Sequence, residues 1–152
     1  MNHAPVTDAS IAVKWVLFEE FTDRARFLYE ASLQAHRRLL VPPHFASEVT
    51  SAIYQRTRAR AAAHRITGDE AEEALRRFAR FRVEILEPAE LYERAFLFAR
   101  DNQIPSLYDS IYITLAQLID AELWTDDRTL INSVGAVAPW IRWIGDYPLA
   151  AP

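Results

Sequence analysis

Four carboxylate side chains stand where the chain is expected to pass from a strand or loop into a helix, or just inside a helix. They are Asp8, Glu48, Asp109 and Asp127. Each lies in an apolar stretch of sequence, and a carboxylate beside buried segments is costly unless something compensates its charge. One divalent cation shared among the four would compensate all of them. The pattern therefore predicts a metal-dependent site for phosphoryl transfer.

Each of these acids also has a simpler structural explanation. Asp8 and Asp127 could be helix N-caps, which accept hydrogen bonds from backbone N–H groups. Asp109 falls in the first turn of its helix, where the helix dipole favours a negative charge. Glu48 could be an ordinary helical glutamate. Capping alone does not explain why three of the acids fall at one edge of the predicted sheet, so we favour the metal site.

Composition restricts the classes of protein to consider. The 152 residues are 51% hydrophobic and 25% charged, which is typical of one globular domain. The absence of cysteine excludes disulfides and thiolate metal sites, and the four scattered histidines do not predict zinc. A net charge of −4 is not the overall signature of a nucleic-acid-binding protein, so a nucleic-acid substrate would need a local basic patch. No membrane span or signal peptide is predicted, and we expect a cytoplasmic protein.

Short apolar strands alternate with helical segments along the whole chain. The expected strands are 4–7, 39–41, 83–86, 122–125 and 140–144. The expected helices are 10–18, 22–37, 44–63, 67–81 (opened by a Thr67–Glu70 capping box), 88–100, 107–119 and 127–134. Alternation of this kind predicts an α/β domain, spanning residues 1–152, with a parallel sheet covered on both faces. Ligands bind at the carboxyl ends of such strands, where Asp8 and Asp127 fall.

Four motifs in a fixed order resemble a known family. They are V-T-D-A-S at 6–10 followed by V-K-W at 13–15, P-P-x-x-x-x-E-V at 42–49, Y-D-S-I-Y-I-T-L-A at 108–116 and W-T-D-D-R-T-L at 124–130. Over residues 6–147 the chain resembles PIN-domain ribonucleases of the VapC toxin type. One departure is Pro5, which interrupts the first strand where many relatives have a continuous apolar run and leaves the start of that strand open.

The resemblance implies a three-layer α/β/α fold with a central parallel sheet of about five strands. It makes the four acids Mg²⁺ ligands and catalytic residues, with Mn²⁺ as an alternative ion. It gives supporting roles to Ser10, Thr125 and Asp126, of which Asp126 occupies a variable position. It also implies a homodimer and a cognate antitoxin that blocks the site.

The favoured function is a Mg²⁺-dependent endoribonuclease, the toxin of a toxin–antitoxin pair, in which a metal-activated water attacks an RNA phosphodiester. Two alternatives stay open. One is a protein-binding module with the same fold and no turnover. The other is a metal-dependent phosphohydrolase acting on small phosphate esters, although the chain has no glycine-rich phosphate-binding loop.

Basic residues could position the RNA. The densest basic stretch contains Arg56, Arg58 and Arg60, and it is either a patch that follows the phosphate backbone or a solvated helix face. The solvated face is the slightly better explanation. Lys14 and Arg128 are nearer to the acids in sequence and are further candidates for contacts with substrate phosphate.

Overall fold

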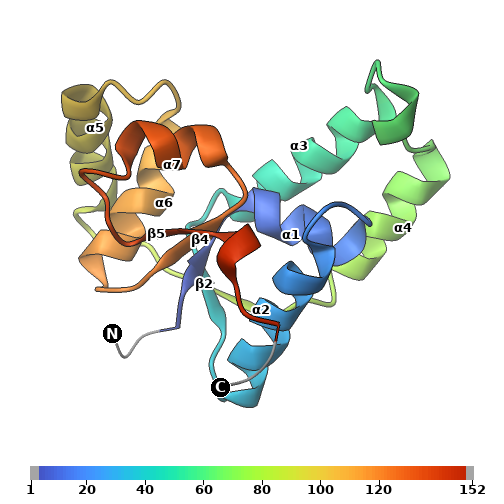
Figure 1. Cartoon of the computed structure of the whole chain (residues 1–152), viewed down its shortest axis with the longest axis horizontal. Coiled ribbons are helices and arrows are strands. Elements are labelled where there is room, and N and C mark those ends of the chain that lie inside the picture. Colours follow the sequence, from blue (N-terminus) through green and yellow to red (C-terminus); the bar gives the residue numbers. More distant parts are fainter. Residues whose placement is uncertain (1–3, 150–152) are drawn as a thin grey trace.

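A five-stranded parallel sheet forms the centre of the computed structural model, which describes residues 4–149 (Figure 1). The strand order is β3-β2-β1-β4-β5, and every neighbouring pair runs parallel. The strands are β1 (Val6–Thr7), β2 (Leu39–Val41), β3 (Val83–Ile85), β4 (Leu123–Thr125) and β5 (Ile141–Trp143). The first and last three residues of the predicted single domain lie outside the described part. The three-layer α/β/α fold with a parallel five-stranded sheet is confirmed.

Helices cover both faces of this sheet. They are α1 (Ala9–Val16), α2 (Thr22–Gln34), α3 (Phe45–Thr57), α4 (Gly68–Phe78), α5 (Leu91–Asn102), α6 (Leu107–Leu118) and α7 (Arg128–Val134), with single 3-10 turns η1 (Ala62–His64) and η2 (Ile144–Asp146). Figure 1 shows α5, α6 and α7 gathered on one side of the sheet and α1 to α4 on the other. None of the helices within residues 4–149 has the length and apolarity needed to cross a membrane.

Helices α1 and α6 both contact the inner strand β4, and their sequences explain this position. Residues 11–16 of α1 and residues 110–116 of α6 are all buried, because both segments carry apolar side chains on nearly every face. Trp15 of α1 stacks on Phe81 with 4.9 Å between ring centroids, and its indole N–H donates to the carbonyl of Ala25 at 3.1 Å. The N-terminal acids of α1 and α6 are consequently fixed by well-packed elements.

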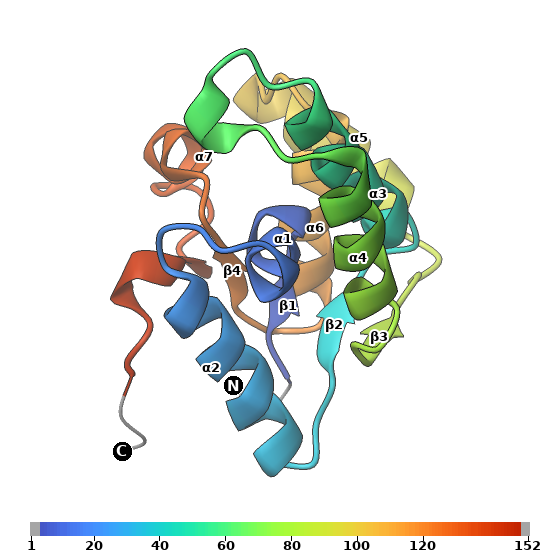
Figure 2. The same ribbon diagram turned by 90° about the vertical axis from the view of Figure 1, so that its right-hand side faces the viewer.

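Helices α3 and α4 form a pair that packs on α1 and extends beyond the sheet (Figure 1). Turned by 90°, the molecule shows α1 at the centre, with α2 on one side and the α3–α4 pair on the other (Figure 2). The predicted capping box opens α4: the Thr67 hydroxyl accepts from the N–H of Glu70 at 3.2 Å, and the Glu70 carboxylate accepts from the N–H of Thr67 at 2.7 Å.

Several predicted elements are longer than the elements in the structure. The first strand is only Val6–Thr7, and the carbonyl of Pro5 still accepts a hydrogen bond from Leu40. Helix α2 ends at Gln34 instead of Arg37, because His36 adopts a left-handed backbone conformation with φ of 54°. Helix α3 ends at Thr57, six residues before the predicted end at Ala63, so the basic stretch runs from the helix end into the following loop and turn.

Candidate active site

Asp8 follows β1 directly and is the N-cap of α1. Its Oδ1 accepts hydrogen bonds from the hydroxyl of Ser10 at 2.6 Å and from the N–H of Ile11 at 3.3 Å. Burial raises the pKa of Asp8 from 3.8 to about 6, while hydrogen bonds with Ser10, Thr125 and Ile11 oppose the rise and the charge of Asp109 adds to it. Asp8 nevertheless keeps a partly exposed surface, so an ion can reach its carboxylate.

Asp127 follows β4 and is the N-cap of α7, with its Oδ1 accepting from the N–H of Leu130 at 2.8 Å. The loop that carries it is held from both sides. The hydroxyl of Thr125 accepts from the N–H of Asp127 at 3.0 Å, and the hydroxyl of Ser10 accepts from the N–H of Asp126 at 3.0 Å. Because Ser10 also donates to Asp8, this one hydroxyl connects the carboxyl ends of β1 and β4.

Glu48 lies in the first turn of α3 and is fixed by an aromatic side chain of α6. The hydroxyl of Tyr112, a residue that is 2% exposed, donates to Oε2 of Glu48 at 2.6 Å. Burial raises the pKa of Glu48, and the hydrogen bond from Tyr112 opposes that rise. His44 lies one turn earlier, with its Nε2 at 3.5 Å from Oε2 of Glu48 and its ring against those of Tyr108 and Tyr112. Burial lowers the pKa of His44, which favours the neutral imidazole.

Asp109 lies in the first turn of α6 and interacts electrostatically with the other three acids. Burial raises its pKa most, the charge of Asp127 adds to the rise and the charge of Glu48 adds a smaller amount, while the hydrogen bond with Ser106 opposes it. Asp109 in turn contributes to the raised pKa of Asp8. Asp109 therefore lies within electrostatic reach of three other carboxylates, and a cation placed among them would relieve the repulsion that raises the pKa of Asp109 and Asp8.

The donor set fits a divalent cation that prefers oxygen ligands. Carboxylate oxygens are ligands of Mg²⁺ and Mn²⁺. The sequence has no cysteine, and no cluster of imidazoles occurs among the residues that the structure describes, so nothing there favours a softer metal. Within residues 4–149, no group of three or more acidic or histidine side chains is close enough to enclose an ion directly. Mg²⁺ keeps several of its water ligands and needs only one or two direct carboxylates, so this spacing is compatible with a hydrated ion.

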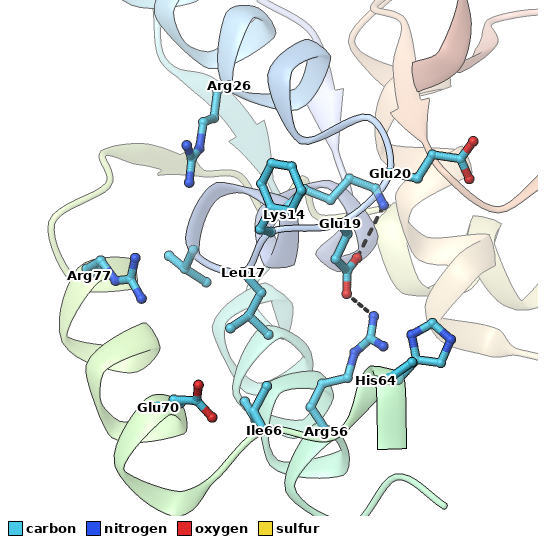
Figure 3. A pocket seen from close by; sticks show the side chains of 13 residues that line it. Lys14, Leu17, Glu19, Glu20, Arg26, Arg56, His64, Ile66, Glu70 and Arg77 are labelled. Carbon is cyan, nitrogen blue, oxygen red and sulfur yellow. Dashed lines mark hydrogen bonds and ion pairs between the residues drawn. The ribbon is translucent and has the colours of Figure 1, made fainter. Parts of the chain in front are cut away.

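Lys14 joins the acidic edge to the α1–α2 connection. It is 3% exposed, and its Nζ lies 2.8 Å from Oδ2 of Asp126 and 3.3 Å from Oε2 of Glu19. Glu19 also pairs with Arg56 of α3, as Figure 3 shows. The result is a chain of alternating charges from Asp126 through Lys14 and Glu19 to Arg56.

The other basic residues proposed for substrate contact lie at the surface. Arg58 is exposed, with its guanidinium 5.9 Å from the ring centroid of Tyr54, and Arg60 is exposed in the loop after α3. Arg128 follows Asp127 directly, and its guanidinium lies 4.0 Å above the ring of Trp143. Of these three, only Arg128 is next to one of the four acids in sequence.

Sequence reasoning missed three residues that contact the site. Tyr112 could have been found, because it lies three residues after Asp109 and so shares its helix face. His44 had a similar signal, since it precedes Glu48 by four residues. It is one of the four histidines scattered along the sequence, and the structure places it partly buried beside Glu48. Glu19 carried no signal, because its role depends on the folding of α2 and α3 around the end of α1.

Comparison with known proteins gives one result that covers most of the chain. A family model described as PIN domain matches residues 6–135, which contain all four acids, Ser10, Thr125 and Asp126. No curated protein matches the sequence.

Proposed function

The chain belongs to the PIN domain family, whose members are generally nucleases that use divalent metal ions, and we propose that it is a Mg²⁺- or Mn²⁺-dependent endoribonuclease. The observation that carries the proposal is the convergence of Asp8, Glu48, Asp109 and Asp127 at the carboxyl edge of the sheet, where Asp109 interacts with the other three charges. Neighbouring carboxylates that repel one another lower the free energy of unfolding, and a bound cation would offset this loss.

In this proposal the four acids hold the metal, and the chain's other residues hold the acids. When bound, the ion would supply an activated water and neutralise charge on the displaced oxygen of the phosphodiester. Ser10 and the N–H of Ile11 orient the carboxylate of Asp8. Tyr112 orients Glu48. Thr125 and Ser10 fix the loop that carries Asp126 and Asp127. Lys14 balances the charge of Asp126, which we assign an auxiliary role.

The proposal extends to the partners of the chain. Resemblance to the VapC toxins supports a toxin of a toxin–antitoxin pair, which acts on cytoplasmic RNA when free and is silent when an antitoxin covers the acids. Helix α5 supports a homodimer, because it exposes the apolar side chains of Tyr92, Phe96 and Leu97. Arg58, Arg60 and Arg128 are proposed as contacts to RNA phosphate, since their guanidinium groups are at the surface.

The test is cleavage of total cellular RNA by the purified, antitoxin-free protein with Mg²⁺ or Mn²⁺, repeated with EDTA. Asp8→Asn and Asp109→Asn should fold and lose cleavage. Asp101→Asn, an exposed aspartate at the end of α5, is the matched control and should keep it. Full activity in Asp8→Asn, or activity that persists in EDTA, would refute the metal assignment. A folded wild-type protein that cleaves no RNA would favour the protein-binding module, and turnover of small phosphate esters alone would favour the phosphohydrolase.

A further inference from the structure

A cavity of about 630 Å³ lies beside the acidic edge, between the α1–α2 connection and the α3–α4 pair (Figure 3). Residues 16–20 form one wall, Arg26 of α2 contributes to it, and Arg56, His64, Ile66 and Arg77 come from α3, η1, the following loop and α4. The volume is in the range of pockets that hold a small organic ligand.

Cationic side chains face this cavity from several elements. Figure 3 shows Arg26 and Arg77 on one side, and the Glu19–Arg56 ion pair with His64 on the other. The carboxylates in the wall are those of Glu19, Glu20 and Glu70. Glu19 is already paired with Lys14 and Arg56. Arg77 has only a long contact of 3.7 Å with the exposed Glu73, and within residues 4–149 no carboxylate lies in ion-pair distance of Arg26. Arg26 donates from Nη2 to the carbonyl of Trp15 at 3.2 Å, a contact that leaves its charge uncompensated. Arg26 and Arg77 therefore carry charge with which an anion can pair.

An exposed aromatic ring stands in the same wall. Phe18 is 89% exposed although it is entirely apolar, and Leu17 and Ile66 add partly buried apolar surface beside it. A flat ring at the surface, next to arginines, has the composition of sites that stack a base and bind a backbone phosphate in single-stranded nucleic acids.

The cavity and the candidate active site share Lys14. Its side chain lines the cavity, and its Nζ is 2.8 Å from Asp126, the residue before Asp127. Because one lysine side chain reaches from the cavity to Asp126, a strand of nucleic acid with one phosphodiester at the acids would pass beside the cavity.

We propose that this cavity is a subsite for a nucleotide flanking the scissile phosphodiester of single-stranded RNA, with the base stacked on Phe18 and a backbone phosphate bound by Arg26 and Arg77. The subsite rests on the proposed nuclease function. Arg56 has a structural role: its ion pair with Glu19 holds the wall of the cavity in place. Lys14, which pairs with both Glu19 and Asp126, connects that wall to the loop that carries Asp126.

The test measures binding in the absence of metal, so that no cleavage occurs. A fluorescein-labelled, single-stranded 12-nucleotide RNA of mixed sequence is titrated with the intact protein in EDTA and followed by anisotropy. Phe18→Ala and Arg77→Gln should each weaken binding about tenfold, and Arg77→Gln should also lower the salt dependence by the contribution of about one phosphate contact. Both residues are exposed, so the variants should fold as the wild type does.

Two matched controls separate the subsite from general charge and apolarity. Arg76→Gln removes an exposed arginine adjacent to Arg77 that does not line the cavity, and Leu33→Ala removes an exposed apolar side chain of α2 that does not line it either. Both should bind the RNA as the wild type does. Equal losses in the controls and the cavity variants, or unchanged binding in Phe18→Ala and Arg77→Gln, would overturn the subsite. So would a wild-type protein that binds no RNA, which would leave the cavity to a segment of a protein partner.

Failure of the subsite and failure of the proposed function give different results. Cleavage that needs metal and Asp8, but is unaffected by Phe18→Ala and Arg77→Gln in both KM and kcat, would refute the subsite alone. RNA binding that depends on Phe18 and Arg77, in a protein that cleaves nothing with Mg²⁺ or Mn²⁺, would refute the nuclease function and support the cavity as an RNA-binding site.

Discussion

Replacing Asp8 with asparagine should stabilise the metal-free protein. The side chain is desolvated, and its pKa in the folded state is about 6 against an ordinary value of 3.8. Above pH 6 the folded protein must keep a charge that its surroundings disfavour, whereas the unfolded chain hydrates that charge freely. Asparagine has nearly the same shape, and its amide oxygen can still accept from Ser10 and Ile11.

The size and pH dependence of this effect follow from linkage. A difference between 3.8 and about 6 corresponds to about 3 kcal/mol at pH 8, and the partly exposed surface of Asp8 reduces this to about 2 to 3 kcal/mol. As the pH falls below 6 the folded protein takes up the proton before the unfolded chain does. The wild type therefore becomes more stable relative to the variant, and the gap shrinks to about 1 kcal/mol near pH 4.5.

The assay is thermal unfolding in EDTA at pH 8 and pH 4.5. Asp8→Asn should unfold about 5 to 10 °C above the wild type at pH 8, and the difference should narrow at pH 4.5. Asp101→Asn, which removes an exposed carboxylate paired with Arg100, is the control and should change little. An Asp8→Asn variant that is no more stable than the wild type at pH 8 would refute the claim that Asp8 is kept at the site against its own electrostatics.

Three further substitutions test the residues that support the site and the fold. Tyr112→Phe removes the hydroxyl that donates to Glu48 and keeps the buried ring, so the Mn²⁺ affinity measured by calorimetry should fall about tenfold or more. The control Tyr108→Phe, at an exposed position of the same helix, should leave the Mn²⁺ affinity unchanged. Lys14→Met removes the buried cation that pairs with Asp126 and Glu19, and it should lower the free energy of unfolding, measured by urea denaturation, by about 2 kcal/mol. The control Arg94→Met removes a surface ion pair and should lower the free energy of unfolding by less than about 1 kcal/mol. Thr67→Ala breaks the capping box of α4 and should lower the free energy of unfolding by about 1 kcal/mol. The control Thr50→Ala removes an exposed hydroxyl that donates to the carbonyl of Ala46, and it should leave the free energy of unfolding nearly unchanged.

The fold was largely predictable because it depends on local patterns. Short runs of mostly apolar residues such as Leu39–Val41 and Leu123–Thr125 are typical of buried strands, and they alternate with longer helical segments. The capping box at Thr67 fixed the start of α4 correctly. The predicted end of α2 was wrong because His36 adopts a left-handed backbone conformation, which ends the helix without an obvious signal in the sequence.

The acids could be proposed from sequence because strand ends of a parallel sheet meet at one edge. The N-cap explanation of Asp8 and Asp127 is confirmed, and the metal site stays a prediction that the interaction of each with Asp109 supports. What could not be predicted are the contacts between distant segments. The charge chain from Asp126 to Arg56 and the cavity beside it require α1, α2, α3 and α4 to pack together, and no local pattern encodes their mutual positions.

The central claim is that the four carboxylates together bind one kind of ligand, a divalent cation. Calorimetric titration of the purified protein with Mn²⁺ at pH 7.5 tests it most directly, alongside Asp8→Asn, Asp109→Asn and the control Asp101→Asn. We expect saturable binding by the wild type and the control, and at least tenfold weaker binding by Asp8→Asn and Asp109→Asn. Equal Mn²⁺ affinity in all four proteins, or no binding by the folded wild type, would contradict the account.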